Sequence, residues 1–274
     1  MSIKMDYSTI SDADVEKMEQ MSSPSATALL VQAGLLPVPP SSESNPVKLR
    51  ILDLACGAGV ITSLFFNSLA NTNTTNTETH VTCGDLEPQM VKFAQARIER
   101  NGWNAEVVVV DAQAIPFPDN KFTHVLMNMG IQVVPDQARV IQESFRVLAP
   151  SGLFGMTSAS TPGWLPLIHA ALGPSESFTP PPMFTSGPLL SQASITSFLN
   201  QAGFTQVEVK TLSFDTTTGV EEHLVMMRRM LGLEGGMLGG EERWGRYERY
   251  VRERFGEGEV KLTSEMFVTT ARKV

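Results

Sequence analysis

The chain has 274 residues, of which 42% are hydrophobic, so it can bury a full core and is not expected to be disordered. Its formal net charge of −8 argues against nucleic acid as the main partner, because binding to phosphates needs a basic face. The two cysteines are too few for a disulfide scaffold and lack the spacing of a metal site. With no signal peptide and no apolar run long enough for a membrane span, we expect a cytoplasmic protein with no membrane association and no metal.

The first 45 residues predict a helical segment followed by a linker. A helix is expected to start at Ser11 and to break at Ser23-Pro24, and a second helix is expected over residues 25–36. The linker over residues 37–46 is rich in proline and serine. We interpret residues 1–45 as a lid segment preceding a main domain over residues 46–274.

The main domain begins with the stretch LRILDLACGAGVIT, residues 49–62, which predicts a buried strand, a tight turn of small residues and the start of a helix. Strand and helix patterns then alternate, which predicts a parallel, doubly wound α/β sheet. The continuous valines of residues 106–111 favour a strand covered on both faces. The expected strands are 49–54, 79–85, 106–111, 122–128 and 153–158, and the expected helices are 60–70, 88–101 and 135–148.

The chain departs from this alternation after residue 160. Residues 161–187 are rich in proline and aromatic side chains and are too long for a plain connection. We expect the regions around 160–202 and 216–256 to form helical insertions that cover a substrate. Further helices are expected over 190–202, 220–231 and 241–255, and further strands over 206–214 and 261–271.

Three expected strands end in a carboxylate, namely Asp53, Asp85 and Asp111. Because the carboxyl ends of parallel strands share one edge of the sheet, these acids can line one crevice. Their chemistry fits a nucleoside, since Asp85 can accept from both ribose hydroxyls and Asp111 from an adenine amino group, while the amide of Ala112 donates to a ring nitrogen. The alternative for Asp85 is that it only caps the following helix.

Neighbouring residues complete this nucleoside hypothesis. Leu86 and Met90 could sandwich the base, and the backbone of Gly57 to Gly59 would face an amino-acid portion of the ligand. Asp53 could meet an ammonium group directly or through water.

The spacing Asp53-x-Ala55-x-Gly57-x-Gly59, followed by Asp85 and by Asp111-Ala112, resembles the class I S-adenosylmethionine-dependent methyltransferases. The closest subgroup looks like the ubiquinone-biosynthesis-type small-molecule enzymes that are widespread in fungi. The resemblance implies a Rossmann-like, seven-stranded doubly wound sheet with its last strand antiparallel, and S-adenosylmethionine as the cofactor. Ala55 replaces the first glycine of the family motif. A nicotinamide fingerprint is disfavoured because Thr62 stands where its third glycine belongs.

The resemblance also implies that the position after the fourth strand faces the methyl group. We therefore expect Asn128 and Met129 to contact the cofactor, with Gln132 near the acceptor. A hydroxyl acceptor usually needs a base, for which His169 and His223 are the candidates, whereas carbon or amine acceptors need less help.

The composition of the insertions and the lack of a basic surface favour a small, apolar or aromatic acceptor. We expect methylation of an oxygen atom by in-line displacement. The alternative is a regulatory protein of the same fold that binds the cofactor without turnover, and the oligomeric state stays open.

Overall fold

The structure, a computed structural model, describes residues 10–37, 47–70, 77–173, 178, 180, 185–231 and 238–274. The first nine residues, most of the expected linker, the polar loop 71–76 and most of the glycine-rich break at 232–240 lie outside the described residues. The helices are α1 (Asp12–Gln32), α2 (Val60–Ala70), α3 (Pro88–Asn101), α4 (Gln137–Val147), α5 (Leu165–Leu172), α6 (Gln192–Gln201), α7 (Val220–Leu231) and α8 (Glu241–Phe255). The strands are β1 (Val47–Leu54), β2 (Thr77–Asp85), β3 (Ala105–Val109), β4 (Phe122–Met127), β5 (Leu148–Thr161), β6 (Phe204–Gly219) and β7 (Glu259–Lys273).

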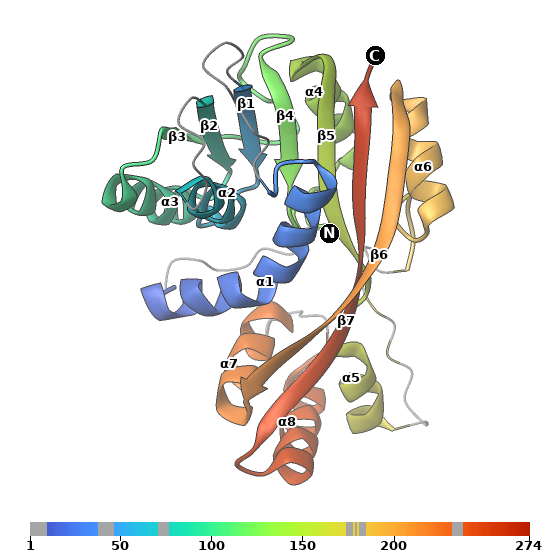
Figure 1. Cartoon of the computed structure of the whole chain (residues 1–274). Helices are drawn as coiled ribbons and strands as arrows, with labels where there is room; N and C mark the ends of the chain where they lie inside the picture. The colour runs from blue at the N-terminus through green and yellow to red at the C-terminus, as the bar shows by residue number, and fades with distance from the viewer. Residues whose placement is uncertain are drawn as a thin grey trace.

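The strands form one seven-stranded sheet in the order β3-β2-β1-β4-β5-β7-β6 (Figure 1). β1 to β5 run parallel to one another, whereas β7 runs antiparallel to both of its neighbours, β5 and β6. The expected Rossmann-like sheet with an antiparallel last strand is therefore confirmed. The order of the strands reverses between β1 and β4, which is where open α/β sheets bind ligands.

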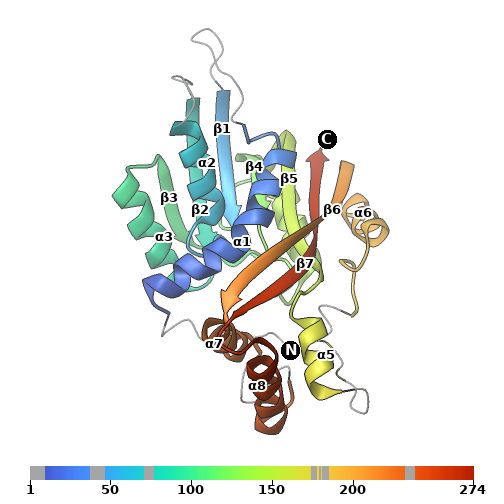
Figure 2. The ribbon, with the colours of Figure 1, turned by 60° about the horizontal axis from the view of Figure 1, so that its bottom comes forward.

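Helices cover both faces of the sheet. On one face α1, α2 and α3 pack in a core that includes Leu29, Phe65 and Ala94. On the other face α4 and α6 pack in a second core that includes Ile141 and Leu199. Figure 2 shows α1 and α2 in front of the sheet. Both faces are thus closed by apolar side chains, and the ends of the strands remain for ligand binding.

Local signals set several helix ends. α3 begins with Pro88 in its first turn and ends at Gly102, whose φ of 64° is left-handed, so its bounds match the expected ones. α4 begins after Asp136, whose carboxylate accepts a hydrogen bond from the amide of Arg139 at 2.9 Å. A capped start of this kind fixes where the helix enters the structure.

The expected break at Ser23-Pro24 is wrong, because α1 continues through Pro24 as one helix. The serine hydroxyls of this region bond the backbone of the preceding turn, with Ser23 Oγ donating to the Glu19 carbonyl at 2.7 Å and Ser25 Oγ to the Ser22 carbonyl at 2.9 Å. Proline removes a helical donor and bends the axis, and α1 changes direction midway along its length (Figure 1).

The expectation that residues 106–111 form a strand covered on both faces is met only in part, because Val107 and Val108 pack against the cores on the two faces but the strand is not fully buried. β3 is an edge strand, and Val109 keeps 52% of its surface exposed. An apolar run alone does not distinguish an edge strand from a central one. Val109, at the carboxyl end of β3, is thus available to a ligand.

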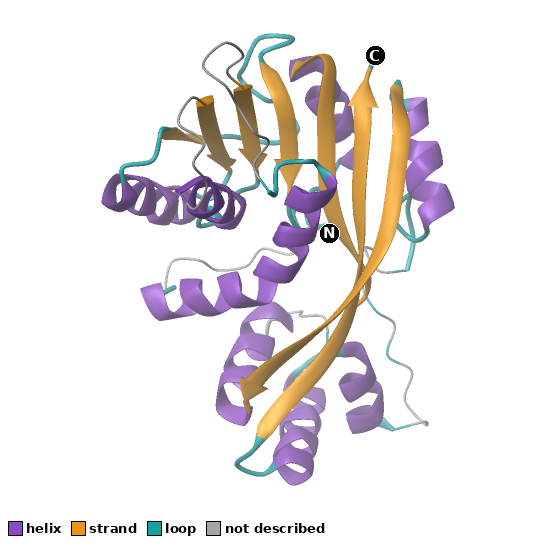
Figure 3. Ribbon diagram, in the orientation of Figure 1, coloured by secondary structure: helices purple, strands orange, loops and turns teal. Residues whose placement is uncertain are grey.

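β6 and β7 are longer than expected and extend as a twisted pair beyond the rest of the sheet (Figure 3). Their distal halves carry α5, α7 and α8, which enclose a third core that includes Trp164, Leu224 and Tyr247. We call these three helices and the distal halves of the two strands the lower lobe. In the part of the chain that the structure describes, no helix has both the length and the apolarity that a membrane crossing requires.

Candidate functional site

The turn between β1 and α2 has an unusual backbone. Ala55, Gly57 and Gly59 all have positive φ, at 52°, 54° and 87°. A Cβ atom added to Gly57 would find nothing within 4 Å, whereas one at Gly59 would touch Ala94 of α3 at 3.9 Å. The backbone at Gly57 is therefore open to a ligand, and that at Gly59 faces a neighbouring helix.

Asp85 ends β2 and holds this turn. Its Oδ2 accepts from the amide of Gly57 at 2.8 Å and its Oδ1 from the amide of Glu87 at 2.9 Å. Burial raises the pKa of Asp85, and the two backbone hydrogen bonds oppose this shift. Each carboxylate oxygen retains a second lone pair, so the group can still accept hydrogen bonds from a ligand.

Apolar side chains flank Asp85. Leu86 is 61% exposed, and Val109, which pairs with Asp85 in the register of β2 and β3, is also exposed. Met90 is 3% exposed and lies in α3. A flat ring at this edge would thus meet Leu86 and Val109 directly, and Val109 is a contact that sequence reasoning missed.

Asp53 points into the protein, although sequence reasoning expected it to face a ligand. It is 1% exposed, and its Oδ2 accepts from the Thr62 hydroxyl at 2.7 Å and from the Thr62 amide at 3.2 Å. Burial raises the pKa of Asp53 to about 7. The carboxylate therefore caps the first turn of α2, a role that the sequence did not indicate.

Asp111 follows β3 and lies beside Asp85, since the amide of Val110 donates to the Asp85 carbonyl at 2.9 Å. The amide of Gln113 donates to Asp111 Oδ1 at 2.8 Å, and the side-chain Nε2 of Gln113 donates to the same oxygen at 3.1 Å. Ala112 is 6% exposed. The structure therefore brings Asp85, Asp111 and the glycine turn together, as the shared edge of the strands requires.

Asn128 uses its side-chain amide to bond neighbouring elements of the protein. Its Oδ1 accepts from Ser25 Oγ of α1 at 2.9 Å and from Thr157 Oγ1 of β5 at 2.7 Å, and its Nδ2 donates to the Ser22 carbonyl at 3.3 Å. The expectation that Asn128 contacts the cofactor stays a prediction, and its side-chain amide is not free for that contact. The side chain instead joins α1 to the centre of the sheet.

Met129 keeps an open position. It is 42% exposed and has a left-handed φ of 58°, which is costly for a residue other than glycine. Its amide donates to Thr157 Oγ1 at 2.9 Å, which helps to hold this backbone. Gln132 is only 8% exposed and donates to the Ala159 carbonyl at 3.2 Å, so its amide nitrogen is used internally.

The two candidate bases lie in the lower lobe. His169 is an exposed residue of α5 whose ring packs edge-on against Phe178. His223 is fully buried, its Nε2 lies 2.7 Å from the Tyr247 hydroxyl, and burial lowers its pKa to about 4. A general base must reach its proton, so the buried position of His223 argues against the role that the sequence suggested.

Comparison with known proteins identifies relatives over nearly the whole chain. The family model described as a methyltransferase domain matches residues 51–152. The methyltransferase tpcH of Aspergillus fumigatus is 25% identical over 90% of this chain and 91% of its own length. The acetylaranotin bis-thiomethyltransferase of Aspergillus terreus is 26% identical over 93% of this chain and 91% of its own length.

Solved structures share the fold. A phosphoethanolamine N-methyltransferase of Haemonchus contortus, in complex with phosphomonomethylethanolamine and S-adenosylhomocysteine, aligns with a TM-score of 0.55 at 18% identity. The alignment covers 91% of this chain and 52% of that protein. Its matching part has the same arrangement of sheet and helices.

Proposed function

The chain belongs to the class I S-adenosylmethionine-dependent methyltransferases, and we propose on that premise that it methylates an oxygen atom of a small, apolar or aromatic metabolite. One observation above all supports binding of the cofactor at the carboxyl edge. The open backbone at Gly57 lies beside a carboxylate, Asp85, that can still accept hydrogen bonds. A Cβ atom at Gly57 would occupy the space where a ligand can approach.

The residues present fit the parts of S-adenosylmethionine. Asp85 would accept from the ribose hydroxyls and Asp111 from the adenine amino group, with Ala112 donating from its amide. Leu86 and Val109 offer apolar contacts to the adenine ring, and Met90 remains a candidate for the same role from within α3.

The turn that contains Ala55, Gly57 and Gly59 would face the amino-acid portion of the cofactor. Asp53 would attract the ammonium group of the cofactor at a distance, as a buried negative charge, or through a bridging water molecule. A direct contact would compete with the hydrogen bonds from Thr62.

When bound, the cofactor supplies an electrophilic methyl group on a positively charged sulfur. The task of the chain is then to align the acceptor and to exclude water. Met129, exposed at the end of β4, and Val133, 43% exposed in the same connection, provide apolar surface for the acceptor. Residues 1–45 and the insertions around 160–202 and 216–256 would cover it.

The proposed reaction does not depend on a strong base from either candidate histidine. His223 is buried against Tyr247, and His169 points to the surface of α5. This favours an acceptor that ionises readily, such as a phenol or an acid, because such a group needs less help from a base.

A sulfur acceptor is the second candidate. The relative from Aspergillus terreus is named a thiomethyltransferase and aligns over 93% of this chain. Thiols ionise near neutral pH and are strong nucleophiles, so this reaction too would proceed without a strong base.

The test is transfer of a labelled methyl group from S-adenosylmethionine to matched pairs of phenols and thiophenols, preceded by calorimetry with S-adenosylhomocysteine. We expect binding of S-adenosylhomocysteine and labelling of phenols. Preferential labelling of thiophenols would select the sulfur alternative, and absence of binding would refute the assignment of the carboxyl edge as the cofactor site.

A further inference from the structure

Gln113 is the residue after the Asp111-Ala112 pair, and all of its polar groups have partners. Its amide and its Nε2 both donate to the Asp111 carboxylate. Its Oε1 accepts from the amide of Asp136 at 3.0 Å, and its carbonyl accepts from Arg139 Nε at 3.2 Å. One side chain thus links the acid after β3 to the first turn of α4.

The two donors of Gln113 favour one oxygen of Asp111. They lie 2.8 and 3.1 Å from Oδ1, whereas Nε2 lies 3.5 Å from Oδ2. Donors fixed on one oxygen restrict rotation of a carboxylate, and the other oxygen is left for a further donor. Asp111 is therefore held in a defined orientation without losing its capacity to accept.

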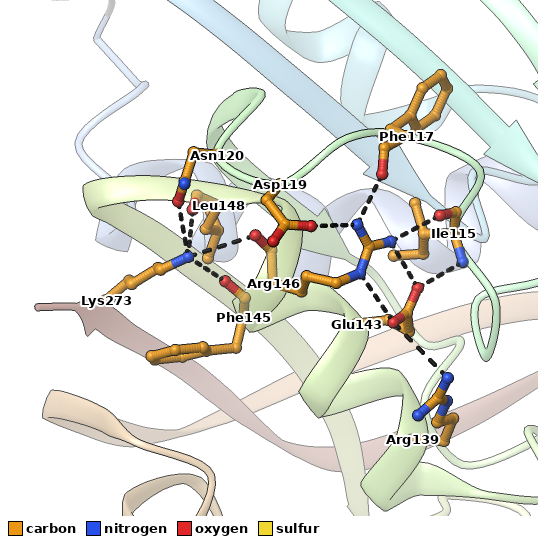
Figure 4. A network of polar contacts seen from close by, with 10 residues as sticks. All are labelled: Ile115, Phe117, Asp119, Asn120, Arg139, Glu143, Phe145, Arg146, Leu148 and Lys273. Carbon is orange, nitrogen blue, oxygen red and sulfur yellow. Dashed lines mark hydrogen bonds and ion pairs between the residues drawn. The ribbon is translucent and has the colours of Figure 1, made fainter.

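Hydrogen bonds to Glu143 and Arg146 of α4 hold the loop that follows Gln113. Arg146 donates to the carbonyls of Ile115 and Phe117, both at 2.8 Å, and Glu143 accepts from the amide of Ile115 at 2.9 Å (Figure 4). Arg146 and Glu143 also pair with each other at 2.8 Å. The loop that carries Gln113 is thus fixed to α4 at several points.

We propose that Gln113 is a positioning residue that orients Asp111 toward the 6-amino group of adenine and thereby sets the selectivity for an adenine cofactor. The inference rests on the proposed cofactor site. A carboxylate oxygen attracts the amino group of adenine but repels the 6-oxygen of hypoxanthine. An oriented carboxylate therefore discriminates between the two bases more strongly than a mobile one.

The experiment measures, by calorimetry, the affinities of the full-length protein for S-adenosylhomocysteine and S-inosylhomocysteine. We expect the wild-type chain to prefer the adenine compound by a factor on the order of 100. Gln113→Met keeps the size of the side chain and removes its amide. This variant should lose about tenfold of that preference, mainly through weaker binding of the adenine compound.

Gln95 provides the matched control. Its Nε2 also donates to a neighbouring carboxylate, that of Glu99 at 2.7 Å, but on the exposed surface of α3. Gln95→Met should leave both affinities unchanged. Thermal unfolding of each variant confirms that the protein is folded under the conditions of the titrations.

A second variant, Gln113→Glu, tests the donation from Nε2 itself. Its new carboxyl group keeps an acceptor toward the Asp136 amide and faces Asp111, while Arg139 bonds the backbone carbonyl of the same residue. Above its pKa the new group repels Asp111, and below it the protonated group can donate to Asp111 as the amide does. Its affinity for S-adenosylhomocysteine, relative to wild type at the same pH, should therefore recover as the pH falls from about 8 to about 5.

The outcomes separate the two proposals. Unchanged base preference in folded Gln113→Met, or no recovery of Gln113→Glu at low pH, would overturn the role of Gln113 while leaving the cofactor site intact. If wild type binds neither compound, the cofactor site itself is wrong, and the role of Gln113 falls with it.

Discussion

Replacement of Gly130 by alanine tests the close contact between this residue and Ala55 of the glycine turn. A Cβ atom at Gly130 would lie 2.7 Å from Ala55 Cβ and 2.9 Å from Met127 Cε. Contacts this short force neighbouring atoms to move, and overpacking of a buried site typically costs about 1–3 kcal/mol. We therefore expect Gly130→Ala to lower the free energy of unfolding by about 2 kcal/mol.

The second mutation makes this reasoning testable. Ala55→Gly relieves a left-handed φ worth about 1–2 kcal/mol, and the greater freedom of glycine in the unfolded chain offsets about half of this. In the Ala55→Gly background the nearest clash is gone, and the remaining short contacts are with the side chain of Met127, whose Cε lies at 2.9 Å and whose Cγ lies at 3.2 Å. Gly130→Ala should then cost about 1 kcal/mol or less, which gives a coupling energy of about 1–2 kcal/mol.

The assay is urea unfolding of the wild type, both single variants and the double variant, with equal m-values as the criterion for a shared unfolded state. Calorimetry with S-adenosylhomocysteine reports whether the turn keeps its shape. Additive effects within about 0.5 kcal/mol would refute the contact between Ala55 and Gly130 as the cause.

Three further changes test individual groups. Asp85→Asn should weaken binding of S-adenosylmethionine about 10- to 100-fold, as expected for loss of a charged hydrogen bond, and unchanged affinity in calorimetry would mean that Asp85 serves only the backbone. Tyr247→Phe leaves His223 Nε2 without its partner and should cost about 1–3 kcal/mol in urea unfolding at unchanged affinity for S-adenosylhomocysteine; a loss of affinity would instead connect the pair to the cofactor site. The raised pKa of Asp53, about 7 against an ordinary value of 3.8, means that the folded state binds the proton more tightly, so stability from this group declines as the pH rises from about 4 to about 7. Asp53→Asn should remove that decline and should be the more stable protein at pH 8, and parallel pH profiles of the two proteins would contradict the assignment.

The grouping of Asp85, Asp111 and the glycine turn at one edge could be predicted from the sequence because these residues lie at strand ends. A pattern of alternating strands and helices predicts which ends share an edge, and the structure brings Asp85 and Asp111 to neighbouring positions there. Gly57 could be recognised from the short turn that must reverse the chain after β1. These features depend on local spacing and on the topology of the sheet, and both can be inferred without knowing any distant contact.

The direction of a side chain depends on partners that the sequence does not pair. Asp53 could face a ligand or the next helix, and the choice is made by the hydroxyl of Thr62. Likewise, nothing local to β3 shows that it forms the edge of the sheet and leaves Val109 exposed. The sequence alone is therefore compatible with either direction of Asp53 and with either a central or an edge position of β3.

Asn128 illustrates the consequence for the N-terminal segment. Its partner Ser25 lies 103 residues away along the chain and belongs to the half of α1 after Pro24. That half also contributes Leu29 to the core, and Gln32 donates to the backbone carbonyls of β6 and β7. The first half of α1 instead reaches α3 and α7 through charged side chains, with Glu19 paired to Arg97 and Lys17 to Glu222.

The two halves of α1 therefore differ in what holds them. Leu29 and Ser25 are completely buried, and burial of apolar groups and satisfied hydroxyls binds the second half to the sheet. In the first half, the pair between Lys17 and Glu222 is about half exposed on both sides, and such pairs contribute about 0–1 kcal/mol. The pair between Glu19 and Arg97 is only about 20% exposed, and Val15 is buried, so Glu19 and Val15 hold the first half more firmly than Lys17 does. The half of α1 after Pro24 thus belongs to the fold that holds Met129 in place, whereas the half before it is held mainly by Val15 and two ion pairs and is the better candidate for a cover.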